Sequence, residues 1–397
     1  MMIEPFSLSR LPRILFGAGR IAELPTLARE FGTRVLLITG KQSFSASPHW
    51  QPLLAGLEHH RISWLQETVS GEPSPQWVDD AVARHHASGI DVVVGIGGGS
   101  VLDAGKAVAG LLPHAESVMN FLEGVGNGRY TGPALPYIAA PTTAGTGSEA
   151  TKNAVLSVQG PQGFKKSFRH ECLVPAYALV DPDLLATCSP ALMAANGMDA
   201  LTQLMESYVS TKANTVTDAL AWSGIRAVKD GFFPAWRGGD DPGAAVGRAA
   251  MAYAALLSGI TLAQVGLGSV HGLASPLGAF FPIPHGVVCG TLLAAATEIN
   301  IRALRSRQPG HAALSKYAEL GVLLSGAHAA TNAAAEDRLV ELLHEWTERL
   351  ALPRLGDYGV TLNDFPRIIA NCRGNSMKTN PIVLRDEEVH AILSQRL

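Results

Sequence analysis

The sequence predicts an α/β domain with a parallel sheet, followed by an all-α domain. In the first half of the chain, short apolar runs, the first two rich in β-branched residues, lie at 34–39, 91–96, 137–141 and 177–182. Amphipathic stretches such as 77–88 show helical spacing between these runs. Strands that alternate with helices are typical of a parallel sheet covered on both faces.

The second half of the chain lacks this alternation. Ser189 fits a helix N-cap, because Pro190 follows it at the first helical position. Long runs rich in Ala and Leu come next, at 191–210, 217–231, 244–263 and 335–350. We therefore place the domain boundary near Cys188 and predict two domains, 1–188 and 189–397.

Composition indicates a globular enzyme. Of the 397 residues, 47% are hydrophobic and 16% are charged, which argues against disorder. The formal net charge is −3, and Lys and Arg form no cluster. We therefore expect neither a nucleic acid nor an anionic membrane as a partner.

The cysteines and the N-terminus indicate a cytoplasmic protein. The four cysteines form no CxxC pair and are scattered, at Cys172, Cys188, Cys289 and Cys372. We expect reduced thiols rather than a zinc ribbon or a disulfide framework. The first ten residues, MMIEPFSLSR, hold no apolar stretch of the kind a secretory signal needs.

One segment is long and apolar enough to suggest a membrane span. Residues 249–270 carry no charge, and a span needs about 20 apolar residues. The segment also holds several Gly, Ser, Thr and Gln residues and runs into a His-containing motif. We therefore expect a helix buried on all sides within the helical domain.

The first glycine loop follows the apolar run at 91–96. Gly97, Gly98 and Gly99 let the backbone approach an anion, and Ser100 and a helix N-terminus offer hydrogen-bond donors. The sequence matches neither the GxGxxG dinucleotide fingerprint nor the Walker pattern. We interpret the loop as a pyrophosphate site, with a plain tight turn as the alternative.

A second loop and a third strand end extend this cofactor site. The second loop puts four hydroxyls around two glycines, at Thr142, Thr143, Thr146 and Ser148. Such turns can be local structure, but paired loops at the ends of parallel strands bind ligands in open α/β sheets. At the end of the run at 34–39, Gly40 is followed by Lys41 and Ser43. An acidic residue there would hydrogen-bond an NAD ribose, so we expect NADP to be favoured over NAD.

Three residues of the second half suggest a metal site. His271 and His285 are fourteen residues apart, and we expect Pro276 and the run PIP at 282–284 to break the helix between them, so that both turn to one point. With Asp199 they form a common ligand set for a catalytic divalent metal. Gln203 lies four residues after Asp199, on the same face of a helix.

These motifs resemble the iron-containing (group III) alcohol dehydrogenase family. The matching stretches are GGGSVLDAGKAVA, PTTAGTGSEAT, KKS…P…ALVDP, GMDALTQLMESYVS, HGLASPLGAFFPIPHG and TNP, in the family's order along nearly the whole chain. The resemblance implies a Rossmann-like NAD(P) domain, a helical domain of the dehydroquinate synthase-like architecture, a metal in the cleft between them, and a homodimer or larger homo-oligomer. It assigns cofactor contacts to the first loop with Asp103, and to the second loop with Lys165.

In the resembled family the four metal ligands fall on Asp199, Gln203, His271 and His285. Typical members carry His at the second position, and many carry another His where this chain has Ser275. Three ligands and a substrate oxygen already complete a tetrahedral site. Zn²⁺ tolerates this arrangement better than Fe²⁺, and Gln203 could add a carbonyl oxygen.

The alternative is a metal-free site, as in the related maleylacetate reductases. His271 or His285 would then donate a proton to the developing alkoxide. In a third interpretation, Gln203 only forms a hydrogen bond within the helical domain and nothing binds.

The leading function is an NAD(P)-dependent alcohol dehydrogenase or aldehyde reductase, in which the metal lowers the alcohol pKa and a hydride passes to nicotinamide. The rivals are a non-redox cyclase resembling dehydroquinate synthase and a non-catalytic relative. A cyclase of that kind needs a basic pocket for a phosphorylated substrate. Here the second domain's motif is apolar, which favours a small uncharged substrate; its residues are Leu273, Leu277, Phe280 and Phe281.

Overall fold

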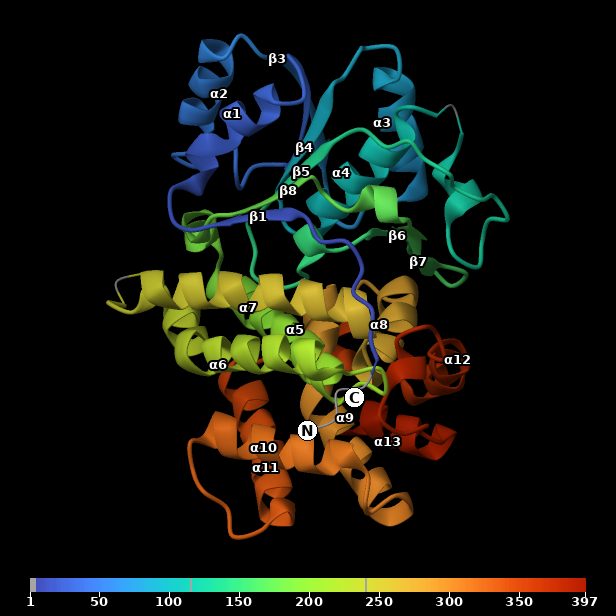
Figure 1. Cartoon of the computed structure of the whole chain (residues 1–397). Helices are drawn as coiled ribbons and strands as arrows, with labels where there is room; N and C mark the ends of the chain where they lie inside the picture. The colour runs from blue at the N-terminus through green and yellow to red at the C-terminus, as the bar shows by residue number, and fades with distance from the viewer. Residues whose placement is uncertain (1–4, 115, 240) are drawn as a thin grey trace.

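The computed structural model describes residues 5–114, 116–239 and 241–397, and these form a sheet domain above a helical domain (Figure 1). The main sheet contains β1 (Arg13–Phe16), β2 (Arg34–Gly40), β3 (Ser63–Val69), β4 (Val92–Gly97), β5 (Tyr137–Pro141) and β8 (Tyr177–Val180). The strand order is β1-β8-β5-β4-β2-β3, and every neighbouring pair is parallel. The predicted fold class is confirmed.

Helices cover both faces of this sheet. They are α1 (Leu24–Arg29), α2 (Trp50–His59), α3 (Pro75–His85) and α4 (Gly99–Leu111). In β2, Val35 and Leu37 pack with residues of α1 and α2, whereas Leu36 and Ile38 pack with residues of α3 and α4. The strand is apolar without alternation because both of its faces are buried.

The connections of the sheet reverse direction between β2 and β4. From β2 the chain continues outward to β3, whereas from β4 it continues the other way to β5 and β8. In open α/β sheets a ligand binds in the crevice at the carboxyl ends of the strands beside such a reversal. Gly40 ends β2 and Gly97 ends β4, so the predicted cofactor residues lie at this crevice.

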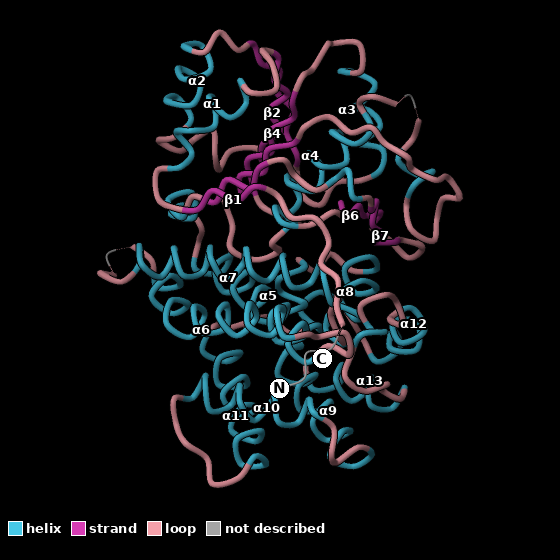
Figure 2. The backbone as a smooth tube through the Cα atoms, viewed as in Figure 1, coloured by secondary structure: helices cyan, strands magenta, loops and turns pink. Residues whose placement is uncertain are grey.

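The helical domain contains α5 (Pro190–Val209), α6 (Thr215–Arg237), α7 (Ala244–Val265), α8 (Ser269–Phe280), α9 (His285–Arg307), α10 (Ala312–Ser325), α11 (Asn332–Arg349), α12 (Phe365–Asn371) and α13 (Asp386–Gln395). Helices α7 and α8 lie nearest the sheet domain, and α6 lies below α7 (Figure 2). Ser189 caps α5 as expected, accepting a hydrogen bond from the Leu192 amide. An antiparallel hairpin that the sequence analysis did not identify, β6 (Asn153–Val158) with β7 (Phe164–Arg169), lies beside α4 and α8.

Two helices, α7 and α9, are long and apolar enough to cross a membrane. In α9, 89% of the most apolar window is buried inside the protein, and in α7 61% is buried. Helix α7 packs between α5, α6 and the sheet domain's second loop. The expectation of one helix buried on all sides at 249–270 is confirmed only in part, because 61% of the apolar window of α7 is buried and the segment spans two helices, with α7 ending at Val265 and α8 beginning at Ser269.

Two sequence interpretations in the α8 region were wrong. Pro276 lies inside α8, which ends at Phe280, because the fully buried neighbours Leu273, Ala274 and Leu277 offset the roughly 3 kcal/mol that an interior proline costs. Leu273 and Leu277 therefore belong to the core and do not line a substrate cleft. The chain changes direction toward His285 only in the segment after Phe280, and not at Pro276.

Candidate metal and cofactor site

Three helices bring four potential metal ligands together. Helix α5 supplies Asp199, α8 supplies His271, and α9 supplies His285 and Cys289. One ligand atom from each of these residues lies within 4.8 Å of the others. We call this set the ligand cluster.

The distances within the ligand cluster are short. The Nε2 atoms of His271 and His285 lie 3.3 Å and 3.8 Å from Asp199 Oδ1. The Cys289 Sγ atom lies 3.6 Å from Nε2 of His271 and 3.7 Å from Nε2 of His285. The structure thus joins three of the four predicted ligands and adds a thiol that the sequence analysis had treated only as a reduced cysteine.

Asp199 shows that the ligand cluster suits a cation. Its side chain is 1% exposed, and within the described residues neither carboxylate oxygen has a hydrogen-bond partner. A buried carboxylate that accepts no hydrogen bond carries a desolvation cost, even with the His271 imidazole 3.3 Å away. A divalent metal bound by this oxygen and by the imidazoles would remove that cost, and the donor set is one that Zn²⁺ and Fe²⁺ accept.

Glu206 orients His271 and was missed by the sequence analysis. Its Oε2 atom lies 2.6 Å from His271 Nδ1, and its Oε1 accepts a hydrogen bond of 2.7 Å from the Val270 amide. A carboxylate on one imidazole nitrogen fixes the other nitrogen as a metal ligand. The signal was present in the sequence, because Asp199, Gln203 and Glu206 have the spacing of one helical face.

Gln203 is buried, and its carbonyl oxygen already has a partner. Ser258 of α7 donates a hydrogen bond of 2.7 Å to Gln203 Oε1. Ser258 Oγ also lies 2.8 Å from the Ala255 carbonyl and 3.4 Å from the Gly145 carbonyl. Gln203 therefore links α5 to α7, and its role as a metal ligand stays a prediction.

The charges of the ligand cluster are interdependent. Burial alone would raise the pKa of Asp199, but the neighbouring His285 and His271 lower it to about 2. Burial lowers the pKa of His285 to about 4. Burial also opposes a charge on His271, yet the neighbouring Cys289 and Glu206 raise its pKa well above the ordinary value. Burial raises the pKa of Cys289 to about 12.

The two predicted cofactor loops pack against each other. A Cβ atom placed on Gly98 would come within 3.3 Å of Thr143, and one on Gly99 within 2.7 Å of Thr146. A Cβ atom placed on Gly97 would come within 2.5 Å of Val101. The Gly97 carbonyl accepts a hydrogen bond from the Thr142 amide. The glycines are therefore required for packing, in addition to any approach to an anion.

Gly98 is the N-cap of α4, with Gly99 and Ser100 in the first helical turn. This helix N-terminus is partly exposed, as an anion site requires.

The second loop also reaches the helical domain. Gly147 adopts a positive φ of 60°, and its carbonyl would lie only 2.0 Å from a Cβ atom on Gly259 of α7. Gly145 contacts Asn196, which precedes Asp199 by one turn of α5. The loop that ends β5 thus lies next to the helix that carries the metal carboxylate.

Two predicted cofactor residues belong to a buried network. Ser148 donates a hydrogen bond of 2.5 Å to Asp103, and Asp103 also accepts one from the Val155 amide. The ammonium group of Lys106, fully buried, donates to Ser148 and Thr151 and lies 3.7 Å from Asp103. Burial lowers the pKa of Lys106 to about 8 and raises that of Asp103.

The remaining predicted cofactor residues lie at the edges of the site. Ser43 is exposed beyond the end of β2, near Gly40, and shares a small pocket with Thr142. Lys165 of β7 pairs with Glu72. Burial alone would raise the pKa of Glu72, but Lys165 and Ser157 lower it below the ordinary value. Ser275, where a relay His was expected in the resembled family, donates to the Lys165 carbonyl.

Comparison with known proteins assigns the chain to a family. Residues 12–182 match the iron-containing alcohol dehydrogenase family, and residues 193–397 match its C-terminal region. Alcohol dehydrogenase 4 of Schizosaccharomyces pombe is 33% identical over 96% of this chain and 87% of its own length. The 1,3-propanediol dehydrogenase of Klebsiella pneumoniae is 32% identical over 94% of this chain and 95% of its own.

Solved structures agree with this assignment. A 1,3-propanediol oxidoreductase superimposes with a TM-score of 0.88 at 28% identity, covering 99% of this chain and 100% of its own. A sulfoacetaldehyde reductase of Bifidobacterium kashiwanohense in complex with NAD⁺ superimposes with a TM-score of 0.84 at 25% identity, covering 99% of each chain. The protein is therefore a member of the iron-containing alcohol dehydrogenase family and an oxidoreductase acting on alcohols.

Proposed function

We propose that this protein interconverts a small alcohol and its aldehyde, using NAD(P) and a divalent metal held by Asp199, His271 and His285. The unpartnered buried carboxylate of Asp199 carries this proposal, because it faces two imidazoles. The second loop contacts the same helix through Asn196. This contact supports a nucleotide bound beside the cation site.

A bound metal would polarise the substrate oxygen and lower the pKa of the alcohol. A bound NAD(P) would supply the acceptor for the hydride of the carbinol carbon. His271 is 7% exposed and is held by Glu206, whereas His285 is 26% exposed. His271 therefore acts as a fixed ligand, and His285 is the imidazole closer to substrate and water.

The nucleotide preference that we propose is NADP. Gly40 places no carboxylate at the end of β2, and the exposed Lys41 and Ser43 follow it. A 2′-phosphate would find a cation and a hydroxyl there instead of a repelling charge. The first loop and the N-terminus of α4 would hold the pyrophosphate.

The substrate that we propose is a short, uncharged alcohol. Relatives named 1,3-propanediol dehydrogenase and NAD-dependent methanol dehydrogenase support this class, at 32% and 28% identity. Phe280 and Phe281 are partly buried beside the guanidinium of Arg367. This cation stacks on the aromatic rings, so it is not free for a phosphorylated substrate.

We also propose a cytoplasmic homodimer or larger homo-oligomer. The four free thiols support a reducing compartment, and the exposed side chains of Phe6, Leu8 and Leu11 form an apolar N-terminal segment. Light scattering during size-exclusion chromatography would test the assembly. A monomer at micromolar concentration would contradict it.

One assay tests the main proposal. The purified protein is analysed for metal and then tested for NADH and NADPH oxidation with short aldehydes and keto acids, before and after chelation. We expect turnover that chelation abolishes and a divalent metal restores. Absence of turnover with every carbonyl would contradict the dehydrogenase function. Full activity after verified metal removal would contradict the metal mechanism and favour a metal-free reductase.

A further inference from the structure

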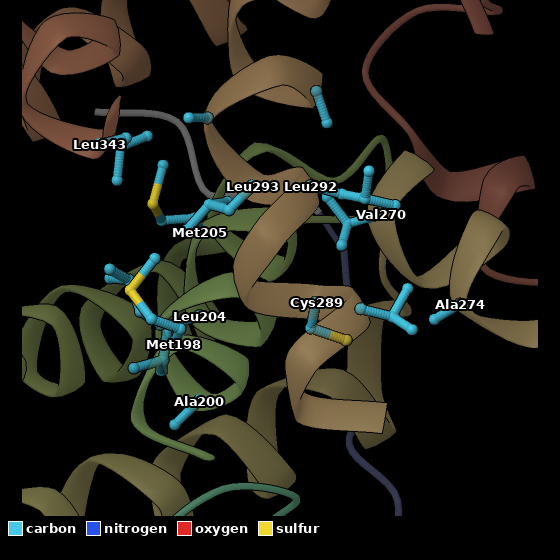
Figure 3. Close-up of a cluster of buried hydrophobic side chains, with 14 of the residues drawn as sticks. Met198, Ala200, Leu204, Met205, Val270, Ala274, Cys289, Leu292, Leu293 and Leu343 are labelled. Carbon is cyan, nitrogen blue, oxygen red and sulfur yellow. The ribbon is translucent and has the colours of Figure 1, made fainter. Parts of the chain in front are cut away.

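Cys289 occupies the position of a fourth vertex in the ligand cluster. It lies one helical turn after His285, so both side chains leave α9 on the same side. Figure 3 shows Cys289 on α9, between Met198 and Leu204 of α5 and Ala274 of α8. Cys289 is fully buried, and its sulfur lies nearly equidistant from the two imidazole nitrogens.

The distances fit a tetrahedron around one ion. With ordinary zinc–ligand bond lengths, tetrahedral coordination separates a nitrogen from an oxygen by about 3.3 Å and a nitrogen from a sulfur by about 3.6 Å. The observed nitrogen–oxygen distances are 3.3 and 3.8 Å, and the nitrogen–sulfur distances are 3.6 and 3.7 Å. These distances are also those of hydrogen bonds between the thiol and the imidazoles, so the sulfur already lies where a ligand of the same ion would lie.

The fourth position is also free of competition from Gln203. The Gln203 carbonyl accepts the hydrogen bond of Ser258, and Ser258 belongs to a helix outside the ligand cluster. An amide oxygen is moreover a weak ligand for a borderline metal, whereas a thiolate is a strong one. The thiol therefore offers the better donor for such a metal.

We propose that Cys289 is a metal ligand of this protein and completes an Asp-His-His-Cys site that selects Zn²⁺ or another borderline metal over Fe²⁺. The inference rests on the metal site of the proposed function and specifies its chemistry. On binding, the thiol proton of Cys289 is released to solvent and the sulfur binds as thiolate. Catalytic zinc sites can expand to five ligands, so four protein ligands would leave the site open to a substrate.

The test uses full-length protein loaded with Co²⁺ in place of the native metal. A thiolate bound to Co²⁺ gives a charge-transfer absorption in the near ultraviolet, separate from the visible bands of the ion. We expect this absorption in the wild type and its loss in Cys289→Ser, with the visible bands retained through Asp199, His271 and His285. Cys172→Ser is the matched control, because Cys172 is exposed and outside the ligand cluster.

A second readout is the affinity for Zn²⁺, measured by competition with a chromophoric chelator. Loss of an outer-shell partner costs about 10- to 100-fold in metal affinity, so loss of a direct ligand in Cys289→Ser should cost at least about tenfold. Cys172→Ser should bind Zn²⁺ like the wild type. Cys289→Ala serves as a second variant, and circular dichroism checks that both variants fold.

The outcomes separate this inference from the function on which it rests. Wild-type protein that binds Co²⁺ without a charge-transfer absorption would overturn the thiolate ligand and leave the metal site standing. An unchanged absorption in Cys289→Ser would also overturn it. Protein that binds no divalent metal at all would overturn both proposals. The charge-transfer absorption is also measured in the wild-type protein alone. The proposal can therefore be tested even if Cys289→Ser fails to fold.

Discussion

Glu206 decides which nitrogen of His271 faces the ligand cluster. Its carboxylate accepts a hydrogen bond of 2.6 Å from the Nδ1–H group of His271. The Nε2 atom then keeps a lone pair for a metal. The same carboxylate also accepts from the Val270 amide at the start of α8. One residue thus sets both the tautomer of the imidazole and the position of the helix that carries it.

Replacing Glu206 by Gln should therefore weaken metal binding without removing a ligand. We expect Zn²⁺ affinity to fall by about 10- to 100-fold, because an amide neither stabilises the Nδ1–H as strongly nor fixes the ring. Chelator competition measures the change. Glu319→Gln is the control, since Glu319 binds Tyr208 in the same domain and lies outside the ligand cluster. Equal affinity in the two variants would contradict the role of Glu206.

Gly40 offers a test of the nucleotide preference. A Cβ atom there would meet Ser43 at 3.6 Å, an ordinary contact, so Asp can be introduced without strain. Its carboxylate would accept a hydrogen bond from the ribose of NADH and repel the 2′-phosphate of NADPH. We expect the ratio of kcat/KM for NADPH to that for NADH to fall roughly tenfold, which corresponds to about 1.4 kcal/mol.

Gly40→Ala is the matched control for that variant, because it adds the Cβ atom without the charge. Steady-state kinetics with both nucleotides at one alcohol concentration supply the ratio. A ratio unchanged in Gly40→Asp would show that the nucleotide ribose does not lie at the end of β2.

Among the elements, α4 is fixed by a single buried ammonium group. Lys106 donates to the carbonyls of Ser148 and Asn153 and to two hydroxyls. It thereby holds the second loop and β6 against the helix whose N-terminus forms the first loop. The geometry of both cofactor loops depends on this side chain.

Lys106→Met should destabilise the sheet domain by roughly 3 kcal/mol, because removing one partner leaves the buried Asp103 and the loop carbonyls without their donor. Urea unfolding measures this difference. Lys166→Met provides the same substitution at an exposed site of β7 and should have little effect. Equal unfolding midpoints for the two variants would contradict this stabilising role of Lys106.

The edge strand β3 is attached to α3 by a charged cluster. Glu67 accepts from Arg84 at 2.8 and 3.0 Å and lies 2.7 Å from His85 Nε2, at the C-terminus of the helix. Burial alone would raise the pKa of Glu67, but Arg84 and His85 lower it below the ordinary value. The folded protein therefore holds this carboxylate charged at a pH where the unfolded chain binds a proton.

This shift makes a part of the stability dependent on pH. The contribution of Glu67 is complete above the unfolded pKa of about 4.3 and is lost as the pH falls through the lower folded value. Glu67→Gln should be less stable than the wild type at pH 7 by roughly 1 kcal/mol, and the difference should shrink as the pH approaches 3. Thermal unfolding at several pH values measures it, with the exposed Glu58→Gln as control. A constant difference across this range would contradict the assignment.

At the scale of the whole molecule, the two sites belong to different domains. All members of the ligand cluster come from α5, α8 and α9 of the helical domain, whereas the cofactor loops end β2, β4 and β5 of the sheet domain (Figure 1). The domains touch where Gly147 meets Gly259 and where Gly145 meets Asn196. These glycine contacts, with the hydrogen bond of Ser275 to the Lys165 carbonyl, hold the cofactor loops against the helical domain.

Metal binding should therefore stabilise the helical domain in particular. Removal of the metal by chelation should lower the melting temperature, and Zn²⁺ at about 100 times its dissociation constant should restore about 2.7 kcal/mol. Differential scanning calorimetry with and without the ion measures this, with KCl at equal ionic strength as control. A melting temperature unaffected by Zn²⁺ would contradict the site.

Several features of the chain followed from the sequence alone. The apolar runs and the helical spacing predicted the parallel sheet and the helical domain, because both patterns report local geometry. The glycine loops and the trio of Asp199, His271 and His285 followed from motifs whose spacing is short or whose order is characteristic. Pro276 shows the limit of this local reasoning, since buried neighbours keep α8 continuous through it.

Only the tertiary structure decided how the site is completed. Cys289 of α9 meets His271 of α8, Glu206 of α5 meets the same imidazole, and Gln203 accepts a hydrogen bond from Ser258 of α7. These partners depend on how α5, α7, α8 and α9 pack. The sequence by itself determined which elements form and which three ligands meet. The packing of those elements decided the fourth donor. The distance between side chains on different helices is set by the packing of the helices and not by the spacing of the residues along the chain.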